Sequence, residues 1–164
     1  MHLIVNISDG RVSRDPADRL ATYSLGSCIA VAACDPVAGV AGLIHVQLPE
    51  SVMDKARAAE RPCMFADTGM EWLIDSMTKA GASARRMQIT LAGAAQILDD
   101  NLFNIGRRNH AAVRKVLWKK GLFIAREDVG GDTPRNVYVN VADGAVSIKP
   151  CGLNAAERRK SCTA

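Results

Sequence analysis

The 164-residue sequence contains no apolar run near the roughly 20 residues that a membrane-spanning helix needs. Its first nine residues lack the basic segment and small-residue cleavage site of a signal peptide, so we expect a cytoplasmic protein. Only 4% of residues are aromatic, whereas 48% are hydrophobic and 23% charged, which is typical of a globular domain. Internal repeats and linker-like segments are also absent. We therefore predict one domain over residues 1–150, followed by a frayed basic tail at 151–164.

The cysteines do not have the spacing of a metal site. There are five, an odd number, and no two are placed as CxxC. In a reducing compartment this argues against a disulfide framework and leaves free thiols, one of which is available as a nucleophile. We expect neither a metal ion nor an organic cofactor.

The formal net charge of +4 comes from basic pairs that are scattered along the chain. With so few aromatic residues, a stacking surface for single-stranded nucleic acid is poorly provided for, and we rank nucleic-acid binding well below the other functions. An acidic protein partner suits the same charge. Most of these basic residues are expected to be solvated surface.

The hydrophobic pattern predicts alternating strands and helices in one α+β domain, with mixed, largely antiparallel β-sheets flanked by helices. Residues 50–66 show no clear period and are interpreted as a mobile loop that includes a short helical turn. We expect a helix that starts at a Thr68 N-cap with Glu71 in a capping box and stops at Gly81, and a second helix ending before Gly121. This second helix covers about 105–120. The other expected elements are strands at 3–7, 87–91 and 122–125, a hairpin at 22–48 and a closing hairpin at 137–148.

The most distinctive stretch is a polar turn at residues 22–28 that delivers Cys28 into an apolar strand, with His45 on the next apolar run. Bulky apolar residues fall at odd positions on the first strand and at even positions on the second. To bury both sets on one face, the paired residue numbers must have an odd sum, because a one-residue slip turns every side chain over. An odd sum also places Cys28 and His45 on a common face. A tight turn makes them direct neighbours, with Cβ atoms about 4.5–5.5 Å apart.

Such a pair suits thiol chemistry. A free thiol is mostly protonated at neutral pH, whereas a thiol beside an imidazolium can be a thiolate, and His45 can then protonate a leaving group. Thr22 has the parity of Cys28, but a straight strand holds it about 20 Å away. A bend at Gly26 would bring Thr22 to the histidine, where it could orient the ring or bind substrate. Amides near Ser27 and Cys28 would then suit an oxyanion, and we expect Gly26 and Ser27 to bind the substrate or its oxyanion.

A purely structural role for Cys28 and His45 is the alternative interpretation. A buried cysteine in a strand is usually a small hydrophobic residue, and a lone histidine is usually structural. The pairing argument alone leaves both interpretations open. For Cys34 and His110 we expect packing or capping, and for Cys63 a spare thiol in a loop.

Several motifs resemble the CheD family, the chemoreceptor glutamine deamidases of bacterial and archaeal chemotaxis. They cover about residues 5–150 in family order and include Leu25-Gly26-Ser27-Cys28, Asp35-Pro36, His45 with Leu48-Pro49, Ile105-Gly106-Arg107-Arg108-Asn109 and Glu127-Asp128-Val129-Gly130-Gly131. The resemblance implies a catalytic triad of Cys28, His45 and Thr22. It also implies a fold like the catalytic domain of the cytotoxic necrotizing factor toxins.

The implied reaction is hydrolysis of the side-chain amide of specific glutamines in methyl-accepting chemotaxis receptors, giving glutamate and ammonia. A CheC-type phosphatase is a further implied partner, and direct membrane insertion is not expected. The alternative is a non-catalytic chemotaxis adaptor that binds receptors or such a phosphatase. The chain departs from the family at Leu91-Ala92-Gly93-Ala94, where Phe-Gly-Gly is common.

Overall fold

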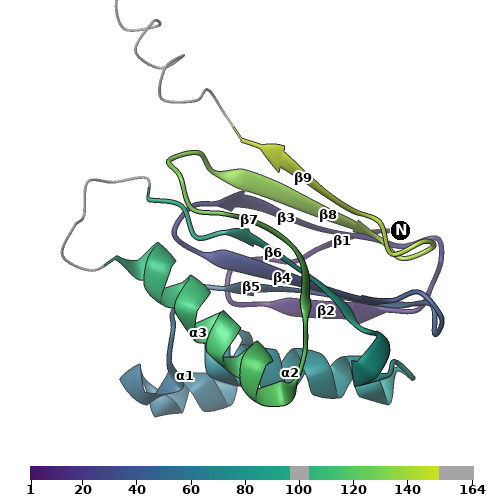
Figure 1. Ribbon diagram of the computed structural model, residues 1–164, viewed down its shortest axis with the longest axis horizontal. Helices are drawn as coiled ribbons and strands as arrows, with labels where there is room; N and C mark the ends of the chain where they lie inside the picture. The colour runs from purple at the N-terminus through teal and green to yellow at the C-terminus, as the bar shows by residue number, and fades with distance from the viewer. Residues whose placement is uncertain (97–103, 152–164) are drawn as a thin grey trace, which may run out of the picture.

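The computed structural model describes residues 1–96 and 104–151, and in these ranges two sheets pack face to face with helices over one of them (Figure 1). The four-stranded sheet has the order β1-β3-β8-β9, and the five-stranded sheet has the order β2-β5-β4-β6-β7. Antiparallel pairs dominate, with parallel pairs at β1–β3 and β6–β7. The predicted α+β class with mixed sheets is confirmed. Within the described residues, no helix is long and apolar enough to cross a membrane.

The described residues form nine strands, three α-helices and three short 3-10 helices. The strands are β1 His2–Ile4, β2 Gly10–Ser13, β3 Arg19–Leu25, β4 Ile29–Asp35, β5 Val40–Val46, β6 Gln88–Gly93, β7 Ile124–Val129, β8 Arg135–Asn140 and β9 Val146–Pro150. The α-helices are α1 Lys55–Glu60, α2 Ala66–Lys79 and α3 Ile105–Lys120, and the short 3-10 helices are η1 Ser51–Met53, η2 Pro62–Met64 and η3 Ala84–Arg86.

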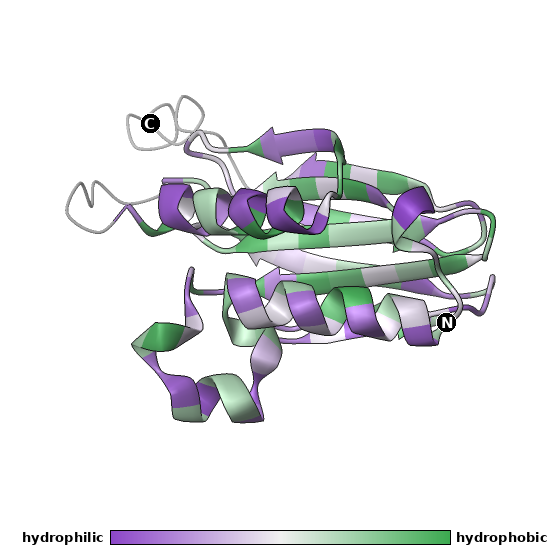
Figure 2. Cartoon of the chain, turned by 60° about the horizontal axis from the view of Figure 1, so that its bottom comes forward, coloured by the Kyte–Doolittle hydropathy of each residue, from purple (hydrophilic) through white to green (hydrophobic). Residues whose placement is uncertain are grey.

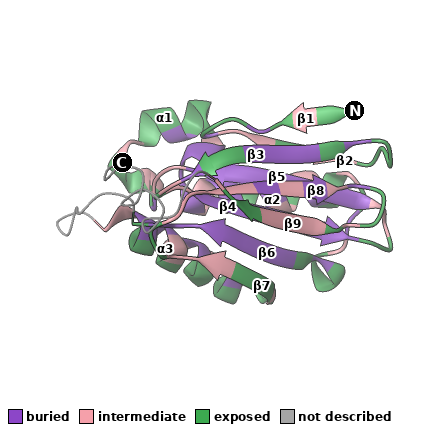
Figure 3. Ribbon diagram, turned by 90° about the horizontal axis from the view of Figure 1, so that it is seen from above, coloured by how far each residue is buried: buried purple, intermediate pink, exposed green. Residues whose placement is uncertain are grey.

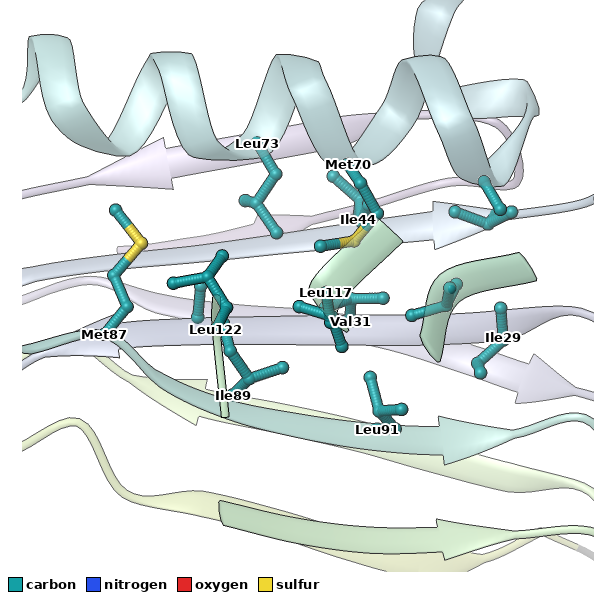
Figure 4. Close-up of a cluster of buried hydrophobic side chains, with 14 of the residues drawn as sticks. Ile29, Val31, Ile44, Met70, Leu73, Met87, Ile89, Leu91, Leu117 and Leu122 are labelled. Carbon is teal, nitrogen blue, oxygen red and sulfur yellow. The ribbon is translucent and has the colours of Figure 1, made fainter. Parts of the chain in front are cut away.

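Strands β4 and β5 lie at the centre of the molecule and are buried at every residue, because both of their faces are covered (Figure 3). One face, with Ile29, Val31 and Ile44, packs against the apolar sides of α2 and α3 (Figure 4). The other face, with smaller residues such as Ala30 and Ala32, packs against the four-stranded sheet. Figure 2 shows the hydrophobic stripes of the two long helices that cover the first face.

The β4–β5 hairpin has the predicted parity, with Ile29 opposite Val46. Its register is shifted from the predicted one, however: Ala30 opposes His45, so Cys28 is a diagonal neighbour of the histidine. The shift arises because the turn is longer than the tight connection expected. The carboxylate of Asp35 accepts hydrogen bonds from two backbone N–H groups inside the turn, and Gly39 supplies a left-handed φ of 61°.

The segment at 50–66 is more helical than the loop with one short helical turn that we expected. This segment contains η1, α1 and η2, and the Asp54 side chain caps α1 by accepting a hydrogen bond from the N–H of Arg57. Helix α2 begins at Ala66, ahead of the predicted Thr68 cap, and the Thr68 hydroxyl instead donates to the Pro62 carbonyl. These short elements carry no long apolar period, so periodicity could not reveal them.

The other predicted helices and strands are present, and some of them begin or end at different residues than predicted. Helix α3 has the predicted bounds and ends at Gly121 with a φ of 66°. Strand β1 ends at Ile4 instead of residue 7, and β7 begins at Ile124 because Leu122 still bonds back to the end of α3. The closing hairpin forms as β8 and β9. From residue 152 onward, the predicted tail lies outside the described residues.

Candidate active site

Strand β3 is irregular where it approaches the nucleophile candidate. Thr22 pairs with Val137, but Leu25 pairs with Arg135, so β3 holds an extra residue in a bulge. Within this bulge Ser24 has a left-handed φ of 55°, and its N–H donates to the Asn136 side-chain oxygen over 2.9 Å. The chain then bends through residues 26–28 before β4 starts. The bend that Thr22 requires is therefore present, and it begins at Ser24.

The bend brings Thr22 from the four-stranded sheet to His45 on β5. The Thr22 hydroxyl oxygen lies 2.8 Å from His45 Nδ1 and donates its hydrogen to the Val5 carbonyl, also at 2.8 Å. Because a hydroxyl has only one hydrogen, the oxygen must accept a hydrogen bond from Nδ1–H. The proton of the neutral imidazole is thus held on Nδ1, and Nε2 carries a free lone pair.

That lone pair has no competing use. His45 is 5% exposed, and its Nε2 has no hydrogen-bond partner within the part of the chain that the structure describes. His45, Thr22 and Cys28 line one cavity of about 230 Å³, which is otherwise formed by residues 4–7 and 23–24. A buried nitrogen base thus shares a small cavity with a half-buried thiol. This arrangement suits proton transfer from sulfur to nitrogen when a substrate enters.

Burial gives both groups their neutral forms at rest. Desolvation raises the pKa of the Cys28 thiol to about 11, although the Cys28 backbone N–H partly opposes this shift. Desolvation also lowers the pKa of His45 to about 4. These shifts favour a neutral thiol and a neutral imidazole over the thiolate–imidazolium pair that the sequence suggested.

The turn that carries Cys28 is fixed through three consecutive carbonyl groups. The oxygens of Gly26 and Cys28 accept hydrogen bonds from the N–H groups of Ala95 and Ala94, at 2.8 and 2.7 Å. The oxygen of Ser27 accepts one from the Asn109 side chain at 3.0 Å. These contacts hold the turn against the end of β6 and the start of α3. The oxyanion role of Gly26 and Ser27 stays a prediction.

Asn109 was missed by sequence reasoning and lies at the centre of this arrangement. It is fully buried, and its Nδ2 donates to the carbonyls of both Ser27 and Gln47, each at 3.0 Å. It therefore ties the turn before Cys28 to the chain just after His45. A signal existed, because Asn109 lies on the same helical stripe as Val113 and Leu117 and is polar.

His110, for which we expected packing or capping, contacts the Glu127 carboxylate over 3.1 Å. Cys34 is buried in the core as predicted, and Cys63 is a free thiol that is buried in η2 instead of lying in a loop. Cys151 lies beside Ser24 near the cavity, with 3.7 Å between its sulfur and the serine hydroxyl. Of the cysteines described, Cys28 alone lines the cavity with His45.

Comparison with known proteins identifies the family. The family model described as CheD chemotactic sensory transduction matches residues 47–150. The chain is 45% identical to "Probable chemoreceptor glutamine deamidase CheD 1" of Syntrophus aciditrophicus, over 92% of this chain and 94% of the relative. It is 42% identical to "Probable chemoreceptor glutamine deamidase CheD" of Solibacter usitatus, over 92% and 89%. It is also 34% identical to "Chemoreceptor glutamine deamidase CheD" of Thermotoga maritima, over 93% and 94%.

The chain belongs to the CheD family. Its departure from the Phe-Gly-Gly pattern now has a structural meaning, because both residues that follow Ala92 are left-handed, with φ of 103° at Gly93 and 51° at Ala94. A Cβ at Gly93 would lie 2.5 Å from the Cys28 carbonyl oxygen, so glycine is required there. Ala94 is a left-handed alanine, a conformation that costs an L-residue about 1–2 kcal/mol. Its N–H still donates to the Cys28 carbonyl and so helps to hold the turn that precedes β4.

Proposed function

We propose that this CheD-family chain is a protein-glutamine deamidase that converts receptor glutamines to glutamate with release of ammonia. The observation that carries the proposal is the Thr22–His45 hydrogen bond, which leaves Nε2 free in the cavity that Cys28 shares. The names of the relatives supply the reaction and the substrate, a chemoreceptor. Cys28 is the proposed nucleophile, His45 the general base and acid, and Thr22 the residue that orients His45.

The first half-reaction begins with both groups neutral. As the Cys28 sulfur attacks the carboxamide carbon, His45 Nε2 takes the thiol proton and the carbonyl oxygen becomes an oxyanion. The resulting imidazolium is a better proton donor than an exposed one, because burial lowers the pKa of His45 to about 4. It therefore protonates the amide nitrogen readily, the C–N bond breaks, and ammonia leaves a glutamyl thioester on Cys28.

The second half-reaction reuses the same base. Water enters the position that ammonia has left, and Nε2 of His45 takes one of its protons as the oxygen attacks the thioester carbon. The C–S bond breaks, glutamate forms, and the imidazolium returns its proton to the Cys28 sulfur. Throughout the cycle Thr22 keeps the other imidazole proton on Nδ1, so that Nε2 always faces the reacting atoms.

The surroundings of the cavity suit a glutamine on a protein. At about 230 Å³ the cavity holds little more than one side chain. Around it lie three apolar side chains that are unusually exposed, Ile4 at 51%, Ile7 at 46% and Tyr23 at 38%. We infer that the glutamine enters the cavity while neighbouring apolar residues of the receptor contact this rim.

The test is ammonia release from a receptor cytoplasmic fragment. The Cys28→Ala variant is expected to release none, whereas Cys151→Ala, which removes the other half-buried thiol near the cavity, is expected to keep wild-type turnover. Circular dichroism checks that both variants fold. Full turnover in Cys28→Ala would refute the proposed nucleophile.

A non-catalytic adaptor is the second candidate, and the raised pKa of Cys28 is the observation that favours it. Alkylation by iodoacetamide at neutral pH does not separate the two, because a thiol with a pKa of about 11 reacts slowly in either case. Ammonia release does separate them. A CheC-type phosphatase stays a proposed second partner, testable by co-purification with the full chain.

A further inference from the structure

The most exposed aromatic side chains in the described residues lie together, away from the cavity that holds Cys28. Trp118, near the end of α3, is 83% exposed, and Phe123, in the connection to β7, is 86% exposed. Both line one groove of about 830 Å³, whose floor is formed by Leu117 and Leu122. In a chain with few aromatic residues, two such rings on one concave surface require an explanation.

The surroundings of this α3–β7 groove are strongly basic. Helix α3 contains six arginine and lysine residues and no acidic residue. Arg114 and Lys115 line the groove itself, and Lys119 and Lys120 follow at the helix end. Three acidic residues lie near them: Glu127 of β7 contacts Arg114 and His110, and Glu50 and Asp67 share a second cavity with Lys115 and Lys119. The six basic residues of α3 exceed these three, so an acidic partner suits the net positive charge of this surface.

Trp, Phe and Arg around a concave surface are the composition of an interface hot spot. The groove is separate from the catalytic cavity, because Asn109 touches the Cys28 turn and Trp118 lies nine residues further along α3, about 14 Å at 1.5 Å per residue. Figure 1 shows α3 running from the side of that turn toward the start of β7. A partner in the groove therefore leaves the cavity open.

We propose that the α3–β7 groove is an exosite for the protein substrate, binding a second, acidic and amphipathic segment of the receptor. This inference rests on the proposed function. A cavity that holds one side chain offers little area, whereas a stable protein interface buries about 1,200 Å² or more. Specific glutamines of a protein are therefore best selected with contacts beyond the cavity.

Other occupants fit less well. A second copy of this chain carries the same net charge of +4, so two basic grooves or surfaces repel each other. A lipid surface is flat, whereas the rings flank a concavity. An acidic protein helix supplies both the carboxylates for the lysines and apolar side chains for the rings.

The experiment compares two substrates, a receptor cytoplasmic fragment and a short peptide centred on one of its deamidated glutamines. The double variant Trp118→Ala/Phe123→Ala is expected to raise KM for the fragment about tenfold, with kcat unchanged. Lys115→Glu/Lys119→Glu is expected to raise it as well, and more steeply at low salt. Neither variant should change kcat/KM for the short peptide, which is too small to reach the groove.

Matched controls alter exposed residues elsewhere. Val37→Ser removes a 79% exposed apolar side chain from the β4–β5 turn, and Lys55→Glu/Arg85→Glu makes the same charge change on other surfaces. Both controls should keep the wild-type KM for the fragment. An unchanged KM in the groove variants, or an equal loss with the short peptide, would overturn the exosite.

Two further measurements identify a different occupant. Wild-type binding to phosphatidylglycerol vesicles that is lost in Trp118→Ala/Phe123→Ala, with KM unchanged, would overturn the proposal in favour of a membrane. Concentration-dependent dimers lost in the same variant would overturn it in favour of a second copy.

Failure of the exosite is distinguishable from failure of the proposed function. In a Trp72→Phe background Trp118 is the remaining tryptophan, and the exosite predicts a blue shift of its emission when the receptor fragment is added. A blue shift without ammonia release would refute the deamidase and keep the docking. Ammonia release without any shift would keep the deamidase and refute the exosite.

Discussion

The hydrogen bond that fixes His45 gives a quantitative prediction for Thr22. Thr22→Val keeps the shape of the side chain but removes the hydroxyl that serves both the Val5 carbonyl and His45 Nδ1. Each of these two buried groups costs about 1–3 kcal/mol when it is left without a partner, so we expect the free energy of unfolding to fall by about 2–6 kcal/mol. The imidazole also loses its fixed tautomer, and kcat should fall at least about tenfold.

The matched control is Thr22→Ser, which keeps the hydroxyl and loses one buried methyl group. It should lower the free energy of unfolding by only about 1 kcal/mol and keep kcat within a few-fold of wild type. Urea unfolding followed by circular dichroism measures stability, and ammonia release at saturating receptor fragment measures kcat. Equal kcat in Thr22→Val and Thr22→Ser would refute the reasoning, because the two variants differ mainly in the hydroxyl.

Three other perturbations test separate contacts. Asn109→Leu leaves the carbonyls of Ser27 and Gln47 unpaired, so the free energy of unfolding in urea should fall by about 2–4 kcal/mol and kcat should also fall. An unchanged kcat would show that the hydrogen bonds of Asn109 do not position Cys28. Gly93→Ala places a Cβ 2.5 Å from the Cys28 carbonyl oxygen at a left-handed φ, so the free energy of unfolding in urea should fall by at least about 2 kcal/mol. Gly121→Ala has a left-handed φ but open space around the new Cβ, and the same free energy should fall by about 1–2 kcal/mol. Arg86 lowers the pKa of Asp35 to about 2, so the stability that this pair contributes is present above pH about 4 and is lost as pH falls toward 2; Asp35→Asn should flatten that part of a urea-midpoint profile.

The central hairpin was predictable because its pattern is strong. The alternation on β4 and β5 fixed which side chains share a face, since each face is buried against a different layer. The register was not predictable to the residue, because it depends on how the Asp35 carboxylate binds the turn. Helix α3 combined a clear period with a Gly121 stop, and its bounds were correct.

The site was only partly predictable, because the positions and the protonation of its residues depend on contacts between segments that are distant in the sequence. Parity placed Cys28 and His45 together, and the need for a bend brought in Thr22, but the bulge at Ser24 depends on pairing with a distant strand. The role of Asn109 depends on two carbonyls far from it in sequence. The neutral resting state of the thiol and imidazole follows from burial, which the sequence does not state.

The most direct test of the account is mass spectrometry of a receptor cytoplasmic fragment after incubation with the full chain. The account predicts that wild-type protein converts specific glutamines to glutamates, seen as the mass increase from amide to acid, and that folded Cys28→Ala and His45→Ala variants leave these residues unchanged. Conversion by the Cys28→Ala variant at the wild-type rate, or no conversion by the wild-type protein, would contradict it.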